Sequence, residues 1–188
     1  MISFREVEIS DAARILKWRT SAEVSNFMLT DVDEDLKKQE SWIKNSYLES
    51  NYYHWIILID NKEVGLLNIK FLKPNEKTIS WGYYIAESNF RGFGAMIPPI
   101  LYNFVFAKLS VEKIYVEVFE DNLNVTSMHN LHGYVRESEF DKTVYKNDVK
   151  RKLIAFSLSA QDWMKKESYR KLVAEFPTKN WIASPFNL

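Results

Sequence analysis

The sequence predicts an α/β fold in which helices flank one mixed β-sheet of about seven strands. Strand-like and helix-like segments alternate along the 188 residues. Three strand segments in a row favour antiparallel hairpins, and a later strand between two helices favours parallel pairing. Residues 78–85 are the most strand-prone segment and form the expected central strand. The sheet should splay where this strand and its parallel neighbour diverge, and we expect a ligand crevice there.

The first elements are expected to be one strand and one short helix. Residues 2–7 read as the strand, and Ser10-Asp11 is a good capping pair for a helix that ends near Arg19. Residues 20–31 read as an irregular segment. Its apolar side chains need a pocket or a lid, because they would otherwise form an exposed patch.

A second helix is expected before the first hairpin. Asp33 or Asp35 should cap this helix, which should run to about Tyr47. The spacing of its apolar residues predicts a buried face of Leu36, Trp42, Ile43 and Tyr47.

The middle of the chain is expected to form antiparallel strands. Residues 53–59 and 64–71 should make a hairpin around a turn at 60–63. A second turn at 74–77 should lead into the central strand. Alternation then puts four side chains of that strand on one face: Ile79, Trp81, Tyr83 and Ile85.

The second half should supply three more helices and three more strands. We expect, in order, a helix over 97–109, a strand over 113–119, a helix from 122 or 124 to 132, strands over 133–141 and 149–158, and a helix over 160–175. Gly133 suits the end of a helix, and Ser159 suits the start of one. We expect one domain over 1–160, with 161–188 packed on it. Trp181 and Phe186 in the tail would cover either the sheet or the partner in a homodimer.

The composition narrows the functional class. Hydrophobic residues make up 46% of the chain, which favours a folded domain over disorder. The 25 basic and 25 acidic residues cancel, so no net charge attracts nucleic acid. The absence of cysteine excludes disulfides, thiolate metal sites and a cysteine nucleophile. No apolar run would span a membrane and the first residues are charged, so we expect a cytoplasmic protein.

A glycine-bearing loop, Arg91-Gly-Phe-Gly94, follows the central strand. A loop at a helix start points backbone N–H groups toward an anion, and glycine has no Cβ to keep a phosphate away. Two glycines after a strand are, taken alone, more often a simple turn. No Gly-Lys-Ser/Thr follows, and Ile97 stands where a dinucleotide fingerprint has its third glycine, so both of those motifs are excluded.

Together with a second segment, the loop resembles the GCN5-related N-acetyltransferases. The loop matches that family's acetyl-CoA pattern, Arg/Gln-x-x-Gly-x-Gly/Ala. The second segment is similar to the family's Asn…Leu-Tyr-Glu-Lys-Leu-Gly-Phe helix and turn. It contains, in order, Glu117, Asn122, Met128-His129 and Gly133-Tyr134. With the element order, the resemblance covers residues 1–160 and implies acetyl transfer from acetyl-CoA.

A narrower resemblance is to the branch that N-acetylates UDP-linked 4-amino-4,6-dideoxy sugars in pseudaminic acid biosynthesis. It rests on Lys17-Trp-Arg19-x-Ser-x-Glu-Val24, Met28-x-Thr30-Asp31, Trp81-Gly-Tyr-Tyr-Ile85 and the pair of Glu117 and His129. This resemblance implies an acceptor with an amine, a sugar and a nucleotide diphosphate. The chain departs from the family pattern at Met96 and Pro98-Pro99, and from the branch at Val32, where a histidine is usual.

The resemblance also implies which residues bind the two substrates. In the family, the splayed strand and one asparagine bond the pantetheine arm, and the glycine loop takes the pyrophosphate. The implied cofactor-binding residues are Tyr84, Ile85, Ala86, Arg91, Gly92, Phe93, Gly94, Ala95, Met96 and Asn122. The implied acceptor-binding residues are Arg19 for phosphate, Tyr83 or Tyr84 for stacking, and Met28, Thr30 and Asp31 for the pocket wall. Core packing is the alternative role for each aromatic residue.

Direct transfer from a thioester to an amine needs a base, oxyanion stabilisation and a proton for the thiolate. Glu117 is the candidate base, since partial burial among apolar strand residues would raise its pKa; the alternative is a solvent-exposed carboxylate. His129 stands where the family usually has a proton-donating tyrosine, and packing is its alternative role. His129 and His132 are spaced like metal ligands, but no third ligand is evident, so no metal is predicted.

Three hypotheses about function remain open at this stage. The first is an acetyl-CoA-dependent N-acetyltransferase for an amino-sugar nucleotide. The second is the same chemistry on another amine, such as a protein N-terminus or a different small molecule. The third is a module that binds CoA without transferring its acyl group, which the departures at Met96 and Pro98-Pro99 would explain.

Overall fold

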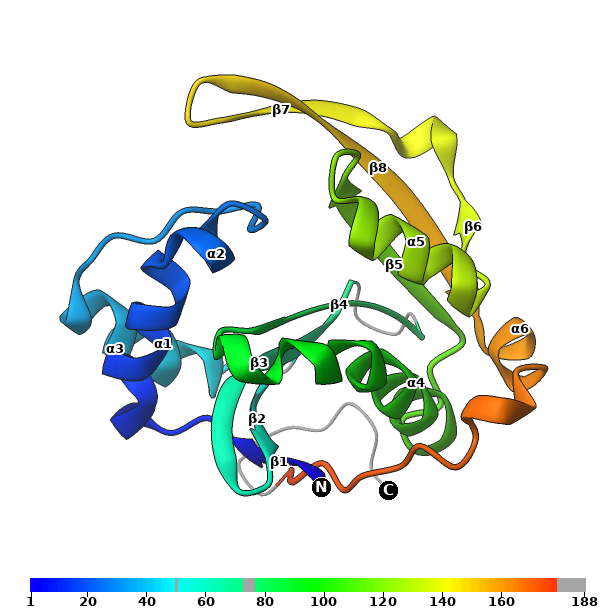
Figure 1. Cartoon of the computed structure of the whole chain (residues 1–188), viewed down its shortest axis with the longest axis horizontal. Helices are drawn as coiled ribbons and strands as arrows, with labels where there is room; N and C mark the ends of the chain where they lie inside the picture. The colour runs from blue at the N-terminus through cyan, green and yellow to red at the C-terminus, as the bar shows by residue number, and fades with distance from the viewer. Residues whose placement is uncertain (50, 73–76, 179–188) are drawn as a thin grey trace.

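The computed structural model describes residues 1–49, 51–72 and 77–178, and they contain one mixed β-sheet with helices on both faces (Figure 1). The strands are β1 (Ile2–Glu6), β2 (Tyr52–Ile59), β3 (Lys62–Phe71), β4 (Thr78–Ile85), β5 (Lys113–Phe119), β6 (Val135–Arg136), β7 (Lys142–Lys146) and β8 (Val149–Ser159). Their order across the sheet is β1-β2-β3-β4-β5-β8-β6, and β7 pairs with β8. The described residues thus form eight strands, one more than the sequence predicted.

The first four strands pair antiparallel, as expected. Asp60 and Asn61 turn the β2–β3 hairpin with left-handed φ values of 49° and 63°. This conformation suits the right-handed twist of the paired strands. The predicted turn at 74–77 falls largely on residues 73–76, which lie outside the described residues.

The predicted splay is confirmed between β4 and β5. These parallel strands pair only where Thr78 faces Lys113 and Ile79 faces Ile114. Beyond this point β5 stays paired with β8 along its whole length, from Lys113 to Phe119. The β4 edge that faces β5 is therefore left open over most of the strand.

The helices divide into two groups on opposite faces of the sheet (Figure 1). Their bounds are α1 (Ala12–Thr20), α2 (Ala22–Ser25), α3 (Leu36–Ser46), α4 (Ile97–Lys108), α5 (Leu123–His132) and α6 (Ala160–Met164). Four 3-10 segments are η1 (Ile9–Asp11), η2 (Ser88–Met96), η3 (Ser138–Phe140) and η4 (Glu167–Tyr169). The first three helices cover a smaller core around Ile43, Ile56 and Tyr84, and α4 packs in a larger core with Trp55 and Ile79.

Most predicted helix ends are confirmed. Asp35 caps α3 by accepting hydrogen bonds from the backbone of Lys37 and Lys38, and Asn122 caps α5. Gly133 ends α5 with a φ of 89°. The first helix, α1, begins at Ala12 directly after Asp11, as expected, and the 3-10 segment η1 precedes it, where Glu8 and Asp11 form a capping box.

Three expectations about residues 20–141 were wrong. The segment 20–31 contains the short helix α2, and Leu36 is 44% exposed and so lies off the buried face of α3. The strand expected over 133–141 is reduced to β6 followed by η3, and β7 was not foreseen.

The last predicted helix stops at Met164 because tertiary contacts capture the backbone beyond it. Asn103 Nδ2 donates hydrogen bonds to the carbonyls of Tyr169 and Leu172, both at 2.8 Å. The chain then runs in extended form and stacks Phe176 on Phe104 at 4.3 Å between ring centroids. A continuous helix to 175 would forfeit these contacts. Trp181 and Phe186 lie outside the described residues.

Candidate functional site

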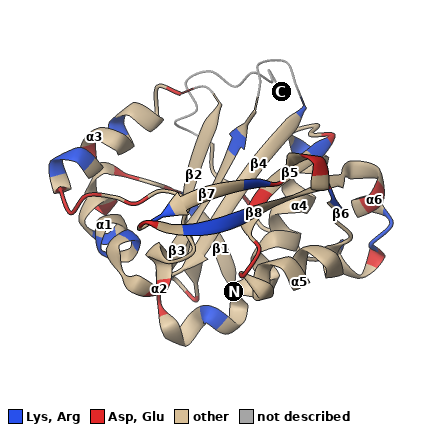
Figure 2. Cartoon of the chain, turned by 90° about the horizontal axis from the view of Figure 1, so that it is seen from above, with Lys and Arg blue, Asp and Glu red and all other residues tan. Residues whose placement is uncertain are grey.

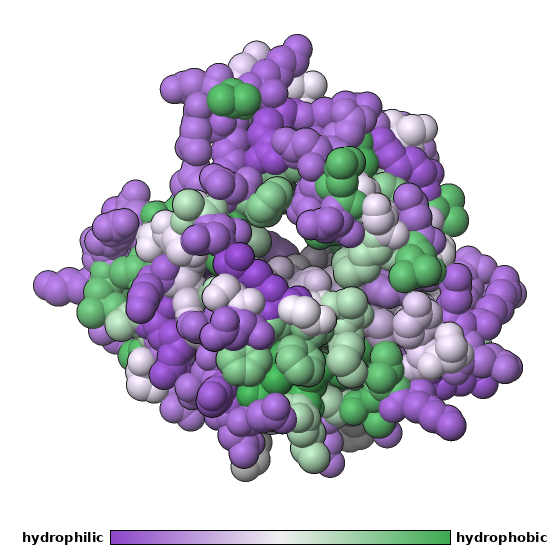
Figure 3. All heavy atoms as spheres, viewed as in Figure 1, coloured by the Kyte–Doolittle hydropathy of each residue, from purple (hydrophilic) through white to green (hydrophobic). Residues whose placement is uncertain are grey.

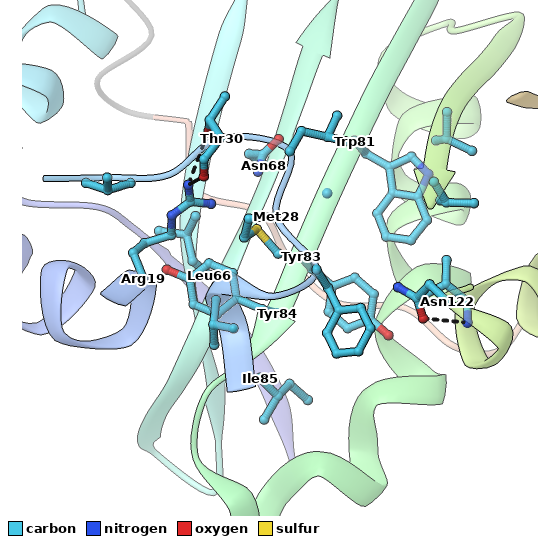
Figure 4. A pocket seen from close by; sticks show the side chains of 18 of the residues that line it. Arg19, Met28, Thr30, Leu66, Asn68, Trp81, Tyr83, Tyr84, Ile85 and Asn122 are labelled. Carbon is cyan, nitrogen blue, oxygen red and sulfur yellow. Dashed lines mark hydrogen bonds between the residues drawn. The ribbon is translucent and has the colours of Figure 1, made fainter. Parts of the chain in front are cut away.

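A cavity of about 1100 Å³ crosses the sheet where β4 and β5 separate (Figure 4). It is lined from both faces of the sheet, by α1, α2, α3, β2, β3, β4, β5, η2, α5 and the segment 27–33 after α2. Twelve of the predicted site residues line it: Arg19, Met28, Thr30, Asp31, Tyr83, Tyr84, Ile85, Arg91, Gly94, Glu117, Asn122 and His129. Five predicted cofactor residues are not among its lining: Ala86, Gly92, Phe93, Ala95 and Met96.

The glycine loop folds as the 3-10 segment η2, which leads directly into α4. Pro98 and Pro99 occupy the first turn of α4, where their missing N–H groups cost no helical bond. A Cβ at Gly92 would meet no atom within 4 Å, and one at Gly94 would come no closer than 3.5 Å to Tyr83 Oη. Neither glycine has a left-handed φ. The fold itself therefore does not require glycine at 92 or 94, and the space beside the backbone is open to a ligand.

Tyr83 and Tyr84 point to opposite sides of β4. Tyr83 stacks on Trp81 with 5.6 Å between ring centroids and donates a hydrogen bond to the Gly94 carbonyl at 3.1 Å. Burial raises its pKa to about 12, so the phenol stays protonated. Tyr84 packs edge-on against Trp18 in the core beneath α1 and α3. From the sequence, Tyr83 was predicted to bind the acceptor. Its hydrogen bond to Gly94 instead places it beside the glycine loop.

Glu117 projects from β5 into the gap left by β4. The last β4–β5 pair is at Ile114, three residues before it. Its carboxylate forms an ion pair with Lys142 of β7, with 2.7 Å between Nζ and Oε2, and accepts a hydrogen bond from Tyr115 Oη at 3.2 Å. The side chain is 22% exposed. This carboxylate is half-buried and oriented by two neighbours, unlike a carboxylate free in solvent.

His129 lies on the α5 side of the gap, and only 1% of the residue is exposed. Its ring contacts Tyr134 at 4.4 Å and Phe156 at 5.5 Å between centroids. Neither ring nitrogen has a hydrogen-bond partner among the described residues. Burial, with a smaller effect from His132, lowers the pKa of His129 to about 3. The imidazole is therefore neutral near pH 7.

Asn122 lines the cavity at the start of α5. Its Oδ1 accepts a hydrogen bond from the backbone of Val125 at 3.4 Å. The amide nitrogen is then directed into the cavity (Figure 4). Asn122 thus combines a capping role with a free donor beside the β4–β5 gap.

The predicted acceptor residues gather at the other side of the cavity. Arg19 Nη2 donates a hydrogen bond to the Thr30 carbonyl at 2.9 Å, which fixes the segment after α2 against α1. Met28 projects into the cavity from the same segment (Figure 4). Asp31 forms an ion pair with Lys146 of β7. The structure therefore brings these residues together, on the opposite side of the gap from η2.

The acetyltransferase (GNAT) domain model matches residues 2–135, more than two thirds of the chain. The chain belongs to the GNAT acetyltransferase family. It is therefore an acyltransferase that uses acetyl-CoA, and the predicted GNAT fold is confirmed.

Individual GNAT relatives agree with this assignment. Acetyltransferase PseH of Campylobacter jejuni is 25% identical over 146 residues, which cover 76% of this chain and 88% of that protein. The spermidine N-acetyltransferase of Vibrio cholerae, solved with CoA and spermine, superposes with a TM-score of 0.78 at 13% identity, covering 87% of this chain and 98% of that one. An aminoglycoside acetyltransferase solved with coenzyme A gives 0.69 at 14% identity, with 89% and 99% covered. At these identities the solved structures establish the fold alone.

The GNAT assignment agrees with the chemistry of the gap. The β4 edge that has lost its β5 partner offers backbone groups to the amides of a pantetheine arm, and the Asn122 amide faces it. The open space at Gly92 and the nearby Arg91 suit a pyrophosphate. These residues fit acetyl-CoA as a co-substrate.

Sequence reasoning missed a group of polar residues on β2 and β3. His54 faces Asn68, and Tyr52 faces Lys70, and all four line the cavity. Burial lowers the pKa of His54 to about 3, and its Nε2 has no hydrogen-bond partner in the described part of the chain. Polar residues at alternate positions of otherwise apolar strands were the signal that could have revealed this wall.

The described residues contain no group of three His, Cys, Asp or Glu side chains that could hold a metal ion. Within the same residues, no helix has both the length and the apolar character needed to cross a bilayer.

Proposed function

We propose that this GNAT enzyme acetylates the primary amine of a nucleotide-linked amino sugar, of the UDP-4-amino-4,6-dideoxy type. The observation that carries the proposal is the cavity itself, which joins the glycine loop on one side of the β4–β5 gap to a basic and aromatic wall on the other. The sequence resemblance to the pseudaminic acid branch and the likeness to PseH support the same acceptor class.

Charge on the acceptor side favours an anionic acceptor. Among the described residues, Arg19 and Lys70 line the cavity and form no ion pair with a carboxylate. Of the acidic lining residues, Asp31, Asp33 and Glu117 are paired with Lys146, Lys38 and Lys142, so Glu23 is the one without a lysine or arginine partner in the described part of the chain. Guanidinium and ammonium groups bind phosphate oxygens well, so a diphosphate suits this wall.

The reaction we infer is a direct transfer. The amine nitrogen attacks the thioester carbonyl, a C–N bond forms, the C–S bond breaks, and the thiolate of CoA leaves. Glu117 accepts the proton that the amine loses, and His129, as a neutral imidazole, donates a hydrogen bond toward the departing sulfur. Backbone N–H groups of β4 stabilise the oxyanion. We assign phosphate binding to Arg19. We assign Tyr84 to the acceptor side in place of Tyr83, because Tyr83 is bonded to the glycine loop.

A panel of acceptors tests the proposal. Purified enzyme with acetyl-CoA is given a UDP-4-amino sugar, spermidine and a peptide with a free N-terminus, and acetylated products are identified by mass. We expect turnover of the sugar nucleotide and little of the other two. Turnover of the peptide or of spermidine alone would contradict the acceptor class. Tight CoA binding without any turnover would favour the non-catalytic module.

A further inference from the structure

The β7–β8 hairpin leaves the sheet and crosses over the cavity. Residues 153–159 of β8 pair with β5, whereas 149–152 pair with β7 only. Asn147 and Asp148 turn the tip with left-handed φ values of 49° and 60°. Figure 2 shows this ribbon passing over the other strands toward α2 and α3. A two-stranded ribbon is only marginally stable by itself, so contacts beyond the hairpin must hold it in place.

Two cationic side chains tie the hairpin to the segment after α2. Lys146 Nζ lies 2.5 Å from Asp31 Oδ1, and its side chain is 5% exposed against 56% for Asp31. Arg151 Nη1 donates a hydrogen bond to the Asn26 carbonyl at 2.8 Å. Lifting the hairpin would break this ion pair and uncover the apolar stem of Lys146, which disfavours opening.

Arg151 is itself fixed to the body of the enzyme. Its guanidinium lies 3.5 Å from the centre of the Phe119 ring and contacts Asp121 Oδ1 at 2.5 Å. One side chain therefore joins the hairpin, the end of β5 and the segment after α2.

The tied hairpin closes a ring around the acceptor side of the cavity. Phe27, Met28 and Asp31, from the segment to which the hairpin is tied, line the cavity. The space-filling view shows an opening beneath the hairpin that persists while both ties are formed (Figure 3). An acceptor can therefore enter lengthwise while the ring is closed.

We propose that Lys146 and Arg151 form a strap that stays closed during turnover and restricts acceptors to molecules that enter end-on beneath the hairpin. Amines flanked by bulk on both sides, such as lysine side chains of folded proteins, are excluded. Lys146 and Arg151 are thus specificity-determining residues that act through the hairpin and do not touch the reacting atoms. The inference rests on the proposed acetyl transfer to an amine, but not on which small amine is accepted.

Locking the strap tests whether it stays closed. The chain has no cysteine, so Asn26→Cys with Arg151→Cys creates a unique pair for a short, reducible bis-maleimide linker. The same protein before linking and after reduction is the control. We expect the linked enzyme to keep its turnover of the best small amine. A loss of at least about tenfold that reduction reverses would show that the hairpin must open, and would overturn the proposal.

Releasing the strap tests specificity. In Lys146→Met with Arg151→Met, we expect faster hydrogen exchange in the hairpin and at least about tenfold better acetylation of lysines in a folded test protein. Lys150→Met, on the exposed part of the same hairpin, should change neither. Unchanged exchange, or faster exchange with an unchanged acceptor range, would overturn the strap. Failure of the proposed function would give a different result, in which the wild-type enzyme acetylates no sugar nucleotide. Hydrogen exchange in the hairpin is measured without turnover, so it still tests the strap in that case.

Discussion

At the residue scale, Glu117 and His129 sit in contrasting environments on the two sides of the gap. Glu117 is half-buried and ion-paired with Lys142, whereas His129 is enclosed by aromatic rings without a polar partner among the described residues. A carboxylate in the first setting can receive a proton from an ammonium ion. The second setting keeps an imidazole neutral, so its contribution to the leaving group would be a hydrogen bond rather than transfer of an imidazolium proton.

Glu117→Gln tests the base. The substitution preserves shape and removes the proton acceptor, so kcat/KM for the amine should fall by about 10²–10⁴-fold while acetyl-CoA affinity stays unchanged. Steady-state kinetics and calorimetric titration with acetyl-CoA provide the two readouts. Glu120→Gln is a matched control, because this carboxylate pairs with Lys152 at the surface. An unaffected kcat/KM in Glu117→Gln would remove Glu117 from the mechanism.

Lys142→Met tests how Glu117 is positioned. Loss of the ammonium at 2.7 Å from Oε2 leaves the carboxylate free to turn away from the gap. The kcat for the amine should then fall by about tenfold while acetyl-CoA affinity stays unchanged, and Lys142→Arg should largely restore kcat. An unchanged kcat in Lys142→Met would mean that this ion pair has no part in the reaction.

The sequence predicted some residues of the site and missed others. Motif spacing located Arg91, Glu117 and Asn122, which all line the cavity. Alternation assigned Tyr83 and Tyr84 to opposite faces but could not tell which face meets the acceptor, because that depends on where η2 folds back. His54 was missed as a site residue, since its cross-strand neighbour Asn68 is fixed only by the β2–β3 register.

At the scale of elements, we propose that η2 and the end of the β4–β5 ladder carry the cofactor site. We expect Gly92→Val to fold normally, because the space beyond Gly92 is empty to 4 Å, and to bind acetyl-CoA at least about tenfold more weakly. Thermal unfolding and calorimetric titration measure the two effects. Gly133→Ala is the opposite control, because Gly133 has a left-handed φ and does not contact the gap. This variant should lose stability but retain its affinity for CoA. Undiminished CoA affinity in Gly92→Val would exclude this loop from the phosphate site.

The elements that the sequence predicted well are those with strong local patterns. β2 to β5 combine apolar alternation with clear turn residues, and α4 and α5 have helix-start and helix-end signals. β7 was missed because Lys142–Lys146 is polar and gains its order from pairing with β8 and from the tie to Asp31. The last helix was extended too far because helix propensity continues beyond Met164, while Asn103 and Phe176 act from distant parts of the fold.

At the scale of the whole molecule, three buried histidines link stability to pH. Burial lowers the pKa values of His54 and His129 to about 3 and that of His132 to about 4. The unfolded chain takes up these protons near pH 6.5. Between that pH and about 4 the unfolded state binds more protons, so stability falls as the pH falls, by up to ~1.4 kcal/mol per pH unit for each histidine.

Urea unfolding at pH 7, 6 and 5 checks this linkage. The midpoint should decrease steadily over the series, and His129→Phe, which replaces the imidazole with another aromatic ring in an aromatic environment, should lessen the slope by about a third. Equal midpoints at pH 7 and pH 5 would mean that the histidines are hydrated in solution.

The central claim is that acetyl-CoA lies in the gap between β4 and β5, with its pyrophosphate on η2 and its thioester near Glu117. A crystal structure of the chain with CoA tests this most directly. We predict pyrophosphate density against the backbone amides of residues 92–96, and a pantetheine arm between β4 and Asn122. CoA bound away from η2, or β4 and β5 paired past Ile79 with CoA elsewhere, would contradict the account.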